Sequence, residues 1–207
     1  MSELKQIEDS SNGDAADAAL LERFQSGDDS AFDELMTRYY RPVLNLIFKF
    51  KGGSAREAED TAQEVFLQLY RALPRFELRA KLFTYIYKVT MNQCLKERRH
   101  RAKDVPIQIS LDAPLDDGTS DRAMKRDFAD PAEGPLSAIE YSELSAQMRE
   151  ALLSIEPEMR APLLLNRFKN LTYDEIAEIM NITPAAVRSR VHRARQVLMK
   201  RLSWLFE

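Results

Sequence analysis

The stretch Leu171–Pro184, LTYDEIAEIMNITP, decides the fold of the C-terminal part of the chain. Thr172 followed by Glu175 forms a capping box, the pattern that starts a helix. Asn181 suits the left-handed residue that ends a helix. Thr183, followed directly by a proline, suits the cap and first turn of the next helix. Two helices separated by about three residues are therefore predicted, in a helix-turn-helix arrangement.

The second of these helices is expected to run from Pro184 to about Leu202. Apolar or small residues at helical spacing predict its inward face: Val187, Val191, Ala194 and Leu198. Between Arg188 and Arg201 there are six Lys or Arg residues and no acidic residue. Arginine, serine and glutamine on an outward face suit a helix that reads the DNA major groove. A basic solvated helix is the plainer alternative, but turn residues, capping and charge agree on DNA binding. The candidate contacts are Thr183, Ala185, Arg188, Ser189, His192, Arg193 and Arg195.

Two further helices are predicted upstream, which together with the helix-turn-helix make a module of residues 137–207. Ser137 with Glu140 opens a helix that ends near Ile155, and Pro157 begins the next. A run of apolar residues forms the expected core of this helix: Leu163, Leu164, Leu165 and Phe168.

The N-terminal half predicts a second all-helical module, residues 16–101. Its helices are expected at 16–26, 30–50, 54–73 and 81–101. Pro42 lies inside the second of them and should kink or split it. The third helix carries one apolar stripe: Ala58, Ala62, Val65, Phe66, Leu69 and Leu73.

The opposite face of that third helix carries Asp60, Glu64 and Leu67. An outward leucine flanked by carboxylates suits docking of a basic protein partner. The alternative is an ordinary solvated face with one stray leucine.

The fourth helix interleaves aromatic and basic side chains: Lys81, Phe83, Tyr85, Lys88 and Asn92 are its candidate site residues. Bases stack on rings while cations hold phosphates, so this composition suits single-stranded nucleic acid. For the rings, burial in the core is the alternative. The cations near Arg101 would also be favourable at a helix C-terminus without any ligand.

The net charge of −3 conceals an alternation along the chain. Residues 1–19 carry five acidic and one basic side chain, and residues 102–140 carry nine and four, so their net charges are −4 and −5. The basic segments are 20–101, at +4, and 141–207, at +2. We expect residues 1–15 to be a disordered acidic tail and residues 102–136 a flexible acidic linker. Both could compact against the basic modules and suppress DNA binding.

Composition excludes several classes of protein. With 207 residues, six Gly and the single Cys94, the chain has no internal disulfide, and a multi-cysteine metal site or glycine-rich phosphate loop is not expected. Cys94 and His100 are too sparse for a metal site, and no nucleophile stands at a recognisable spacing from histidine. No stretch has the roughly 20 apolar residues of a membrane span. We expect a cytoplasmic, all-α, non-enzymatic protein without cofactor, metal or direct membrane insertion.

With both modules considered, the sequence resembles the extracytoplasmic-function (group 4) sigma factors of bacterial RNA polymerase, within the sigma-70 family. The resemblance spans about residues 20–101 and 137–203. Its markers, in chain order, are Ala31–Leu35, Tyr39-Tyr40, Ala58–Phe66, Ala72–Phe76, Thr84–Val89 with Asn92, Leu171–Ala177 and Val187–Arg195. A helix-turn-helix alone would be weak support, whereas the ordered set is specific.

The resemblance implies a region 2 domain and a region 4 domain joined by the linker. It implies that Asp60, Gln63, Glu64 and Leu67 bind the β′ clamp of core RNA polymerase. It further implies that Arg79, Lys81, Phe83, Tyr85, Lys88 and Asn92 read the promoter −10 element, and that the second helix of the helix-turn-helix reads the −35 element. The polymerase β flap is an expected contact of the second module, and the linker is expected to thread toward the active centre.

The family also implies control by an anti-sigma factor, in some cases at the membrane, and a stress-response regulon. In such a complex the two domains would be clamped together. The loop 76–81 departs from the family because it lacks the usual Gly and Ser, which leaves its base preference open. The main alternative function is a helix-turn-helix regulator that acts without incorporation into polymerase.

Overall fold

The computed structural model describes residues 2–52, 55–77, 81–104, 146–169 and 171–203, and the regular elements of these residues are all helical. In chain order they are α1 (Ser2–Gln25), α2 (Ser30–Lys51), α3 (Ala55–Ala72), the 3₁₀ turn η1 (Leu73–Arg75), α4 (Leu82–Asp104), a helix over residues 146–153, α6 (Pro157–Lys169), α7 (Tyr173–Met180) and α8 (Pro184–Arg201). The predicted all-α class is therefore confirmed. The predicted linker, 102–136, lies almost wholly outside the described residues, as does the start of the module predicted at 137.

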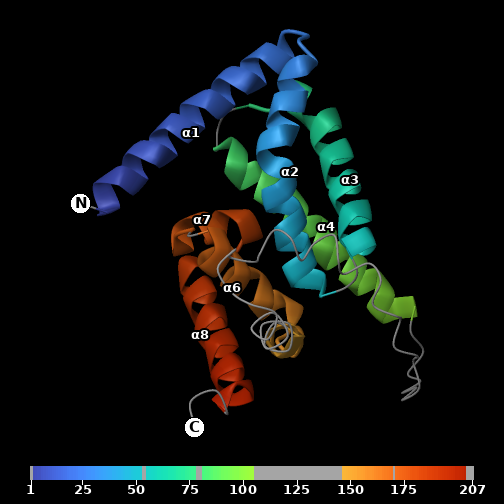
Figure 1. Cartoon of the computed structure of the whole chain (residues 1–207), viewed down its shortest axis with the longest axis vertical. Helices are drawn as coiled ribbons and strands as arrows, with labels where there is room; N and C mark the ends of the chain where they lie inside the picture. The colour runs from blue at the N-terminus through green and yellow to red at the C-terminus, as the bar shows by residue number, and fades with distance from the viewer. Residues whose placement is uncertain (1, 53–54, 78–80, 105–145, 170, 204–207) are drawn as a thin grey trace, which may run out of the picture.

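Helix α2 forms the centre of the N-terminal bundle, because it contacts α1, α3 and α4 (Figure 1). The apolar stripe predicted for α3 is buried against it, including Ala62 and Val65. α2 runs through Pro42 as one helix and is not split there. It ends at Gly52, which adopts a left-handed φ of 63° that glycine accepts without steric strain, and the Gly52 N–H donates to the Phe48 carbonyl.

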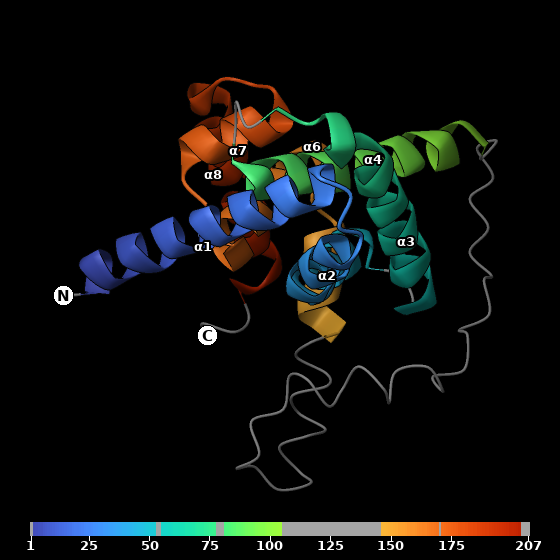
Figure 2. The same ribbon diagram turned by 90° about the horizontal axis from the view of Figure 1, so that it is seen from above.

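Helix α1 differs from the expected short helix with a disordered tail, because it begins at Ser2. Its C-terminal part is fixed to the bundle through Asp17, whose buried carboxylate accepts hydrogen bonds from Arg38 and Tyr39 of α2. Helix extension from an anchored turn adds one hydrogen bond per residue without a new nucleation step, which accounts for the extra turns. The N-terminal part of α1 projects beyond the other helices (Figures 1 and 2).

The C-terminal helices form the predicted helix-turn-helix. Thr172 accepts from the Glu175 N–H and Glu175 accepts from the Thr172 N–H, so the capping box is complete. Asn181 is left-handed, with φ 52°. Thr183 accepts from the Ala186 N–H at the start of α8. α6 packs along α8, and α7 contacts both.

The two modules pack against each other and share a continuous core. α6 contacts α2, and α7 contacts the N-terminal half of the molecule through α4 (Figure 2). The C-terminal end of α4 extends past this contact, beyond α3 (Figure 1). The sequence predicted two domains joined by a flexible linker, and it gave no indication of how they pack against each other.

Candidate nucleic-acid interfaces

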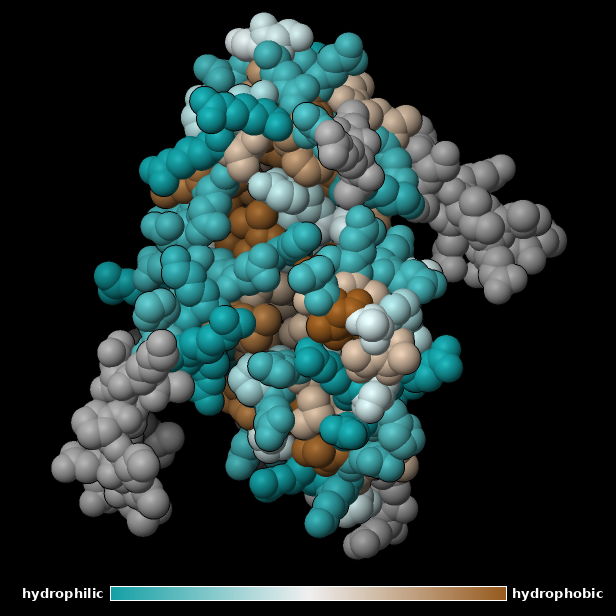
Figure 3. All heavy atoms as spheres, turned by 180° about the vertical axis from the view of Figure 1, so that it is seen from behind, coloured by the Kyte–Doolittle hydropathy of each residue, from teal (hydrophilic) through white to brown (hydrophobic). Residues whose placement is uncertain are grey.

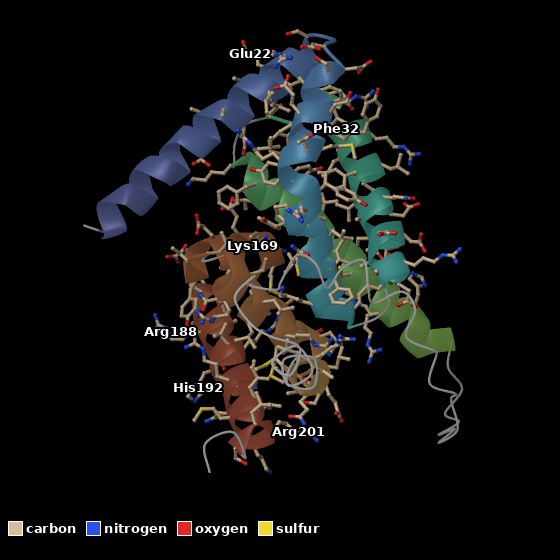
Figure 4. The ribbon with its side chains drawn as sticks, viewed as in Figure 1. Glu22, Phe32, Lys169, Arg188, His192 and Arg201 are labelled. Atoms are coloured by element: carbon tan, nitrogen blue, oxygen red, sulfur yellow. The ribbon has the colours of Figure 1, made fainter. Side chains whose placement is uncertain are left out.

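The first candidate surface, the α8 face, follows directly from the capped start of α8. The inward residues Val187, Val191 and Ala194 are buried against α6 and α7. This packing turns all seven candidate contacts outward, and each is exposed: Thr183, Ala185, Arg188, Ser189, His192, Arg193 and Arg195. Arg188 and His192 point away from the rest of the molecule on the outer side of α8 (Figure 4).

Two arginines of α8 are held by side chains of α6. Arg195 donates from Nη2 to Asn166 Oδ1 at 3.1 Å, and Asn166 in turn donates to the Leu171 carbonyl at 3.0 Å. Arg190 Nη2 lies 3.7 Å from Glu158 Oε2. Neither Asn166 nor Glu158 is predictable from the sequence, because both contacts depend on how α6 crosses α8. The hydrogen bond from Asn166 orients the Arg195 guanidinium on a helix suited to the major groove, whereas the longer pair with the exposed Glu158 only places a carboxylate near Arg190.

The second candidate surface, the α4 face, is less open than expected. Phe83, Tyr85 and Lys88 are half-buried, whereas Asn92 is exposed. Phe83 and Tyr85 both pack against the core, so each ring serves the fold as well as any ligand. The Tyr85 ring packs at a tilt of 37° against Phe76, with ring centroids 4.5 Å apart.

Lys81 stands at the start of the α4 face and is paired with α1. Its Nζ lies 2.9 Å from Asp14 Oδ2, and the hydrogen bond to Asp14 raises the pKa of Lys81. Glu175 of α7 adds a weaker attraction in the same direction. Arg79, the other candidate cation here, lies outside the described residues.

The third candidate surface, the α3 face, comprises Asp60, Gln63, Glu64 and Leu67, and all four are exposed. Leu67 is 48% exposed and, with the exposed Tyr70, places apolar surface on this side of α3. Hydrophilic side chains cover most of the face drawn in Figure 3, with apolar ones gathered in separate patches. α3 and α8 lie on opposite sides of the molecule, so the α3 and α8 faces are well separated (Figures 1 and 2).

A polar network beneath α3 ties it to α2 and α4. Lys51 Nζ lies 2.8 Å from Glu97 Oε2 and 2.7 Å from Thr61 Oγ1. Gln93 bridges Glu97 and Gln68. Burial raises the pKa of Glu97, but the hydrogen bonds from Lys51 and Gln93 outweigh it and the pKa is lowered. The backbone that carries the α3 face is thus fixed by several bonds to charged groups.

Comparison with known proteins decides the family. The sigma-70 region 2 model matches residues 35–104, and the sigma-70 region 4 model matches residues 145–198. The RNA polymerase sigma-H factor of Pseudomonas aeruginosa is 34% identical over 189 residues, which cover 90% of this chain and 93% of that protein. The ECF RNA polymerase sigma factor SigW of Bacillus subtilis is 29% identical over 182 residues, covering 88% and 94%. The chain belongs to the extracytoplasmic-function group of the sigma-70 family.

Solved structures agree with the fold of this sigma factor. CnrH in complex with the cytosolic domain of CnrY superposes with a TM-score of 0.63 at 19% identity, covering 91% of this chain and 97% of that chain. The sigma factor RpoE of Bartonella quintana, in complex with the anti-sigma factor NepR, gives a TM-score of 0.60 at 17% identity, covering 83% and 96%. The resemblance inferred from the ordered sequence markers is confirmed, and region 2 and region 4 correspond to the two packed modules.

The sigma factor also has one buried and one half-buried cation, Arg160 and Lys169, neither of which was predicted from the sequence. Arg160 is 4% exposed, and Lys169 lies at the contact between the two regions (Figure 4). Burial lowers the pKa of Arg160 to about 10 and that of Lys169 to about 8. In the sequence, Arg160 is surrounded by the apolar residues Met159, Ala161 and Leu163. A cation in such a run could have been predicted to be buried with hydrogen-bond partners.

Among the described residues, no group of three or more His, Cys, Asp or Glu is placed so that it could hold a metal ion. None of the described helices has the length and apolar character that a membrane crossing requires. Cys94, the single cysteine, is buried, and burial raises its pKa to about 12.

Proposed function

We propose that this sigma factor directs promoter-specific initiation by three separate surfaces and performs no bond chemistry itself. The α3 face docks on the β′ clamp of core RNA polymerase. The α4 face, together with Arg79, captures the opened −10 element. The α8 face reads the −35 element in the major groove, while the second module contacts the β flap.

The observation that carries this proposal is the α8 face. Seven exposed side chains, three of them arginines, stand at the threonine cap and along a helix whose inner residues Val187, Val191 and Ala194 are buried. Arginine pairs bidentately with guanine edges, and a good base contact is worth about 1–3 kcal/mol of discrimination. Phosphate contacts from neighbouring cations would set the register.

The α3 face supports the polymerase contact by its chemistry. An exposed leucine on the same face as two carboxylates offers an apolar anchor with a charged rim. This arrangement is typical of a protein interface with a basic partner. The polar network below it keeps the helix rigid, so little conformational entropy is lost on docking.

An anti-sigma factor is the proposed regulator. One of the two structural neighbours described above is bound to a protein named as an anti-sigma factor. In this chain the regulator would hold the two regions together in the cytoplasm, or at the membrane if the regulator is anchored there. A stress-response regulon is the corresponding proposal for the genes under control.

Run-off transcription with purified core polymerase tests the initiation function. A template is chosen by mapping transcription starts after controlled expression of the chain. We expect a promoter-specific transcript that requires both core polymerase and the sigma factor. Specific DNA binding without polymerase, and no transcript, would instead support a helix-turn-helix regulator.

A further inference from the structure

The contact between the two regions is centred on the side chain of Arg160. Its Nη1 donates to the Phe50 carbonyl at 2.5 Å, and Nη2 donates to the carbonyls of Leu153 and Ile155, both at 2.7 Å. The guanidinium also lies over the Phe50 ring, 5.5 Å from its centroid. One arginine of region 4 thus joins its own module to the last turn of α2.

The position of the Phe50 carbonyl explains why a cation belongs there. Phe50 is the second-last residue of α2, where carbonyls lack helical partners and the helix dipole is negative. A buried guanidinium needs all the acceptors that the site offers. In this site, the acceptor from region 2 is available only while the two regions are in contact.

A second contact lies next to the first. The side chain of Leu153 covers Gly52, so closely that a Cβ on Gly52 would lie 2.5 Å from Leu153 Cδ1. Leu153 is nonetheless 38% exposed and is not part of the shared core, so region 4 does not need it for its own packing. This leucine therefore acts mainly between the regions.

The closed arrangement affects the three candidate surfaces unequally. The α3 face and the α8 face are exposed. In contrast, α7 and α6 pack on α4, where Lys169 lies over the Tyr87 ring and Glu175 of α7 attracts Lys81 of the α4 face. Of the three helices that carry these surfaces, α4 is the one that contacts the other region.

We propose that the free chain closes on itself through an Arg160–Phe50 latch supported by Leu153 on Gly52, and that opening this latch uncovers the α4 face. No second protein is needed for this closure. Because the α3 face is uncovered in the closed chain, polymerase can dock first and the latch can open afterwards. The importance of this order of events for transcription rests on the proposed function. Closure of the free chain does not depend on that function.

Cys94 provides a native reporter of opening, because it is the single cysteine of the chain and is 1% exposed. It lines a cavity of about 270 Å³ between the regions, together with Glu97 of α4 and with Leu153, Pro157 and Arg160 of region 4. Since thiolate is the reactive form, the raised pKa keeps this thiol slow while the chain is closed.

The experiment measures the rate of Cys94 modification by a thiol reagent in full-length wild type, Leu153→Asp and Arg160→Ala. When closing is faster than modification, the rate reports the open population. Leu153→Asp puts a carboxylate against the negative end of α2. We expect modification to be about tenfold faster, the shift that about 1.4 kcal/mol produces. Small-angle X-ray scattering should show a larger radius of gyration in the same variants.

Met199→Asp is the matched control. It likewise replaces an apolar side chain of region 4 by aspartate, at a residue that is 69% exposed on a helix that contacts α6 and α7 but not α2 or α4. Its rate of Cys94 modification and its radius of gyration should equal those of wild type. Circular dichroism checks that each variant is folded, and Leu153→Asp keeps the test valid if Arg160→Ala fails to fold. Wild-type rates and dimensions in Leu153→Asp would overturn the latch. Neither polymerase nor DNA is present, so that outcome would leave the proposed initiation function intact.

Discussion

Lys169 of region 4 lies over the ring of Tyr87 in region 2, with its Nζ 5.5 Å from the ring centroid. Burial and the neighbouring Lys49 of α2 lower the pKa of this lysine to about 8. Burial also lowers the pKa of Lys49, and burial raises that of Tyr87, which keeps the phenol neutral. The contact between the two regions therefore contains a titratable group whose charge is disfavoured by closure.

We predict that closure strengthens as pH rises from about 8 toward 10.5, the ordinary pKa of a lysine. The open chain binds more protons at Lys169 than the closed chain over this window, so deprotonation favours closure. Below pH 8 both states hold the proton and this dependence vanishes. After solvent screening is allowed for, the gain is on the order of 1 kcal/mol. Small-angle X-ray scattering at a series of pH values measures the closed population. In Lys169→Met this population should not change with pH. An increase in that variant as large as in wild type would contradict the assignment to Lys169.

Removing the capping box should weaken the helix-turn-helix. Thr172→Ala loses the acceptor for the Glu175 N–H, and such a change typically costs about 1 kcal/mol. Urea denaturation measures the change in the free energy of unfolding of the full chain. Thr37→Ala is the control, because the Thr37 hydroxyl only bonds to the Asp33 carbonyl within α2. Equal losses in the two variants would show that the cap has no special role.

A single substitution on the α3 face should weaken the binding of core polymerase. Leu67→Asp removes the apolar anchor and adds a third carboxylate to the patch, so we expect core polymerase to bind at least about tenfold more weakly. Titration of core polymerase with labelled sigma factor measures the Kd. Thr37→Ala, at an exposed position of α2, should bind like wild type. Unchanged affinity in Leu67→Asp would remove this face from the interface.

Loss of a side chain that reads bases should lower the affinity for one promoter element only. Arg193→Ala is expected to lower affinity for the −35 element by about 1–3 kcal/mol, with little change when that element is scrambled. Fluorescence anisotropy of the holoenzyme on the two DNAs at one salt concentration measures this. Met199→Ala serves as the control on the same helix. Equal losses on both DNAs would assign Arg193 to phosphate contact instead.

The network below α3 should matter for stability. Lys51→Met leaves Glu97 without the donor that lies 2.8 Å away, and an uncompensated carboxylate at a half-buried site costs about 1–3 kcal/mol. Thermal unfolding followed by circular dichroism detects the loss. The double variant Lys51→Met with Glu97→Leu should recover part of it, since removing both partners leaves no unpaired charge. No recovery would argue that the two residues act independently.

Local features were predictable from sequence because each depends on neighbours in the chain. The capping box at Thr172, the left-handed Asn181 and the threonine cap before α8 are all present as expected. The exposed Leu67 opposite a buried stripe followed from helical periodicity. Turn chemistry and spacing determine these features without knowledge of tertiary packing.

Features that join distant segments were not predictable. The charge pattern gave no indication that the two expected domains pack together, and nothing in local periodicity indicates that Arg160 reaches the end of α2 110 residues earlier. The expected short first helix extends to Ser2, because the buried Asp17 anchors it to α2. In each case a long-range polar contact decided the outcome.

The anchoring of α1 sets a practical limit on how far the chain can be shortened from its N-terminus. A truncation that begins at Asn12 retains both Asp14, which pairs with Lys81, and Asp17, which pairs with Arg38 and Tyr39. Beginning at Ala18 instead removes both carboxylates and leaves the Tyr39 hydroxyl without its buried acceptor. Purification tags are therefore best attached ahead of Asn12, on the projecting part of the helix and away from its junction with α2.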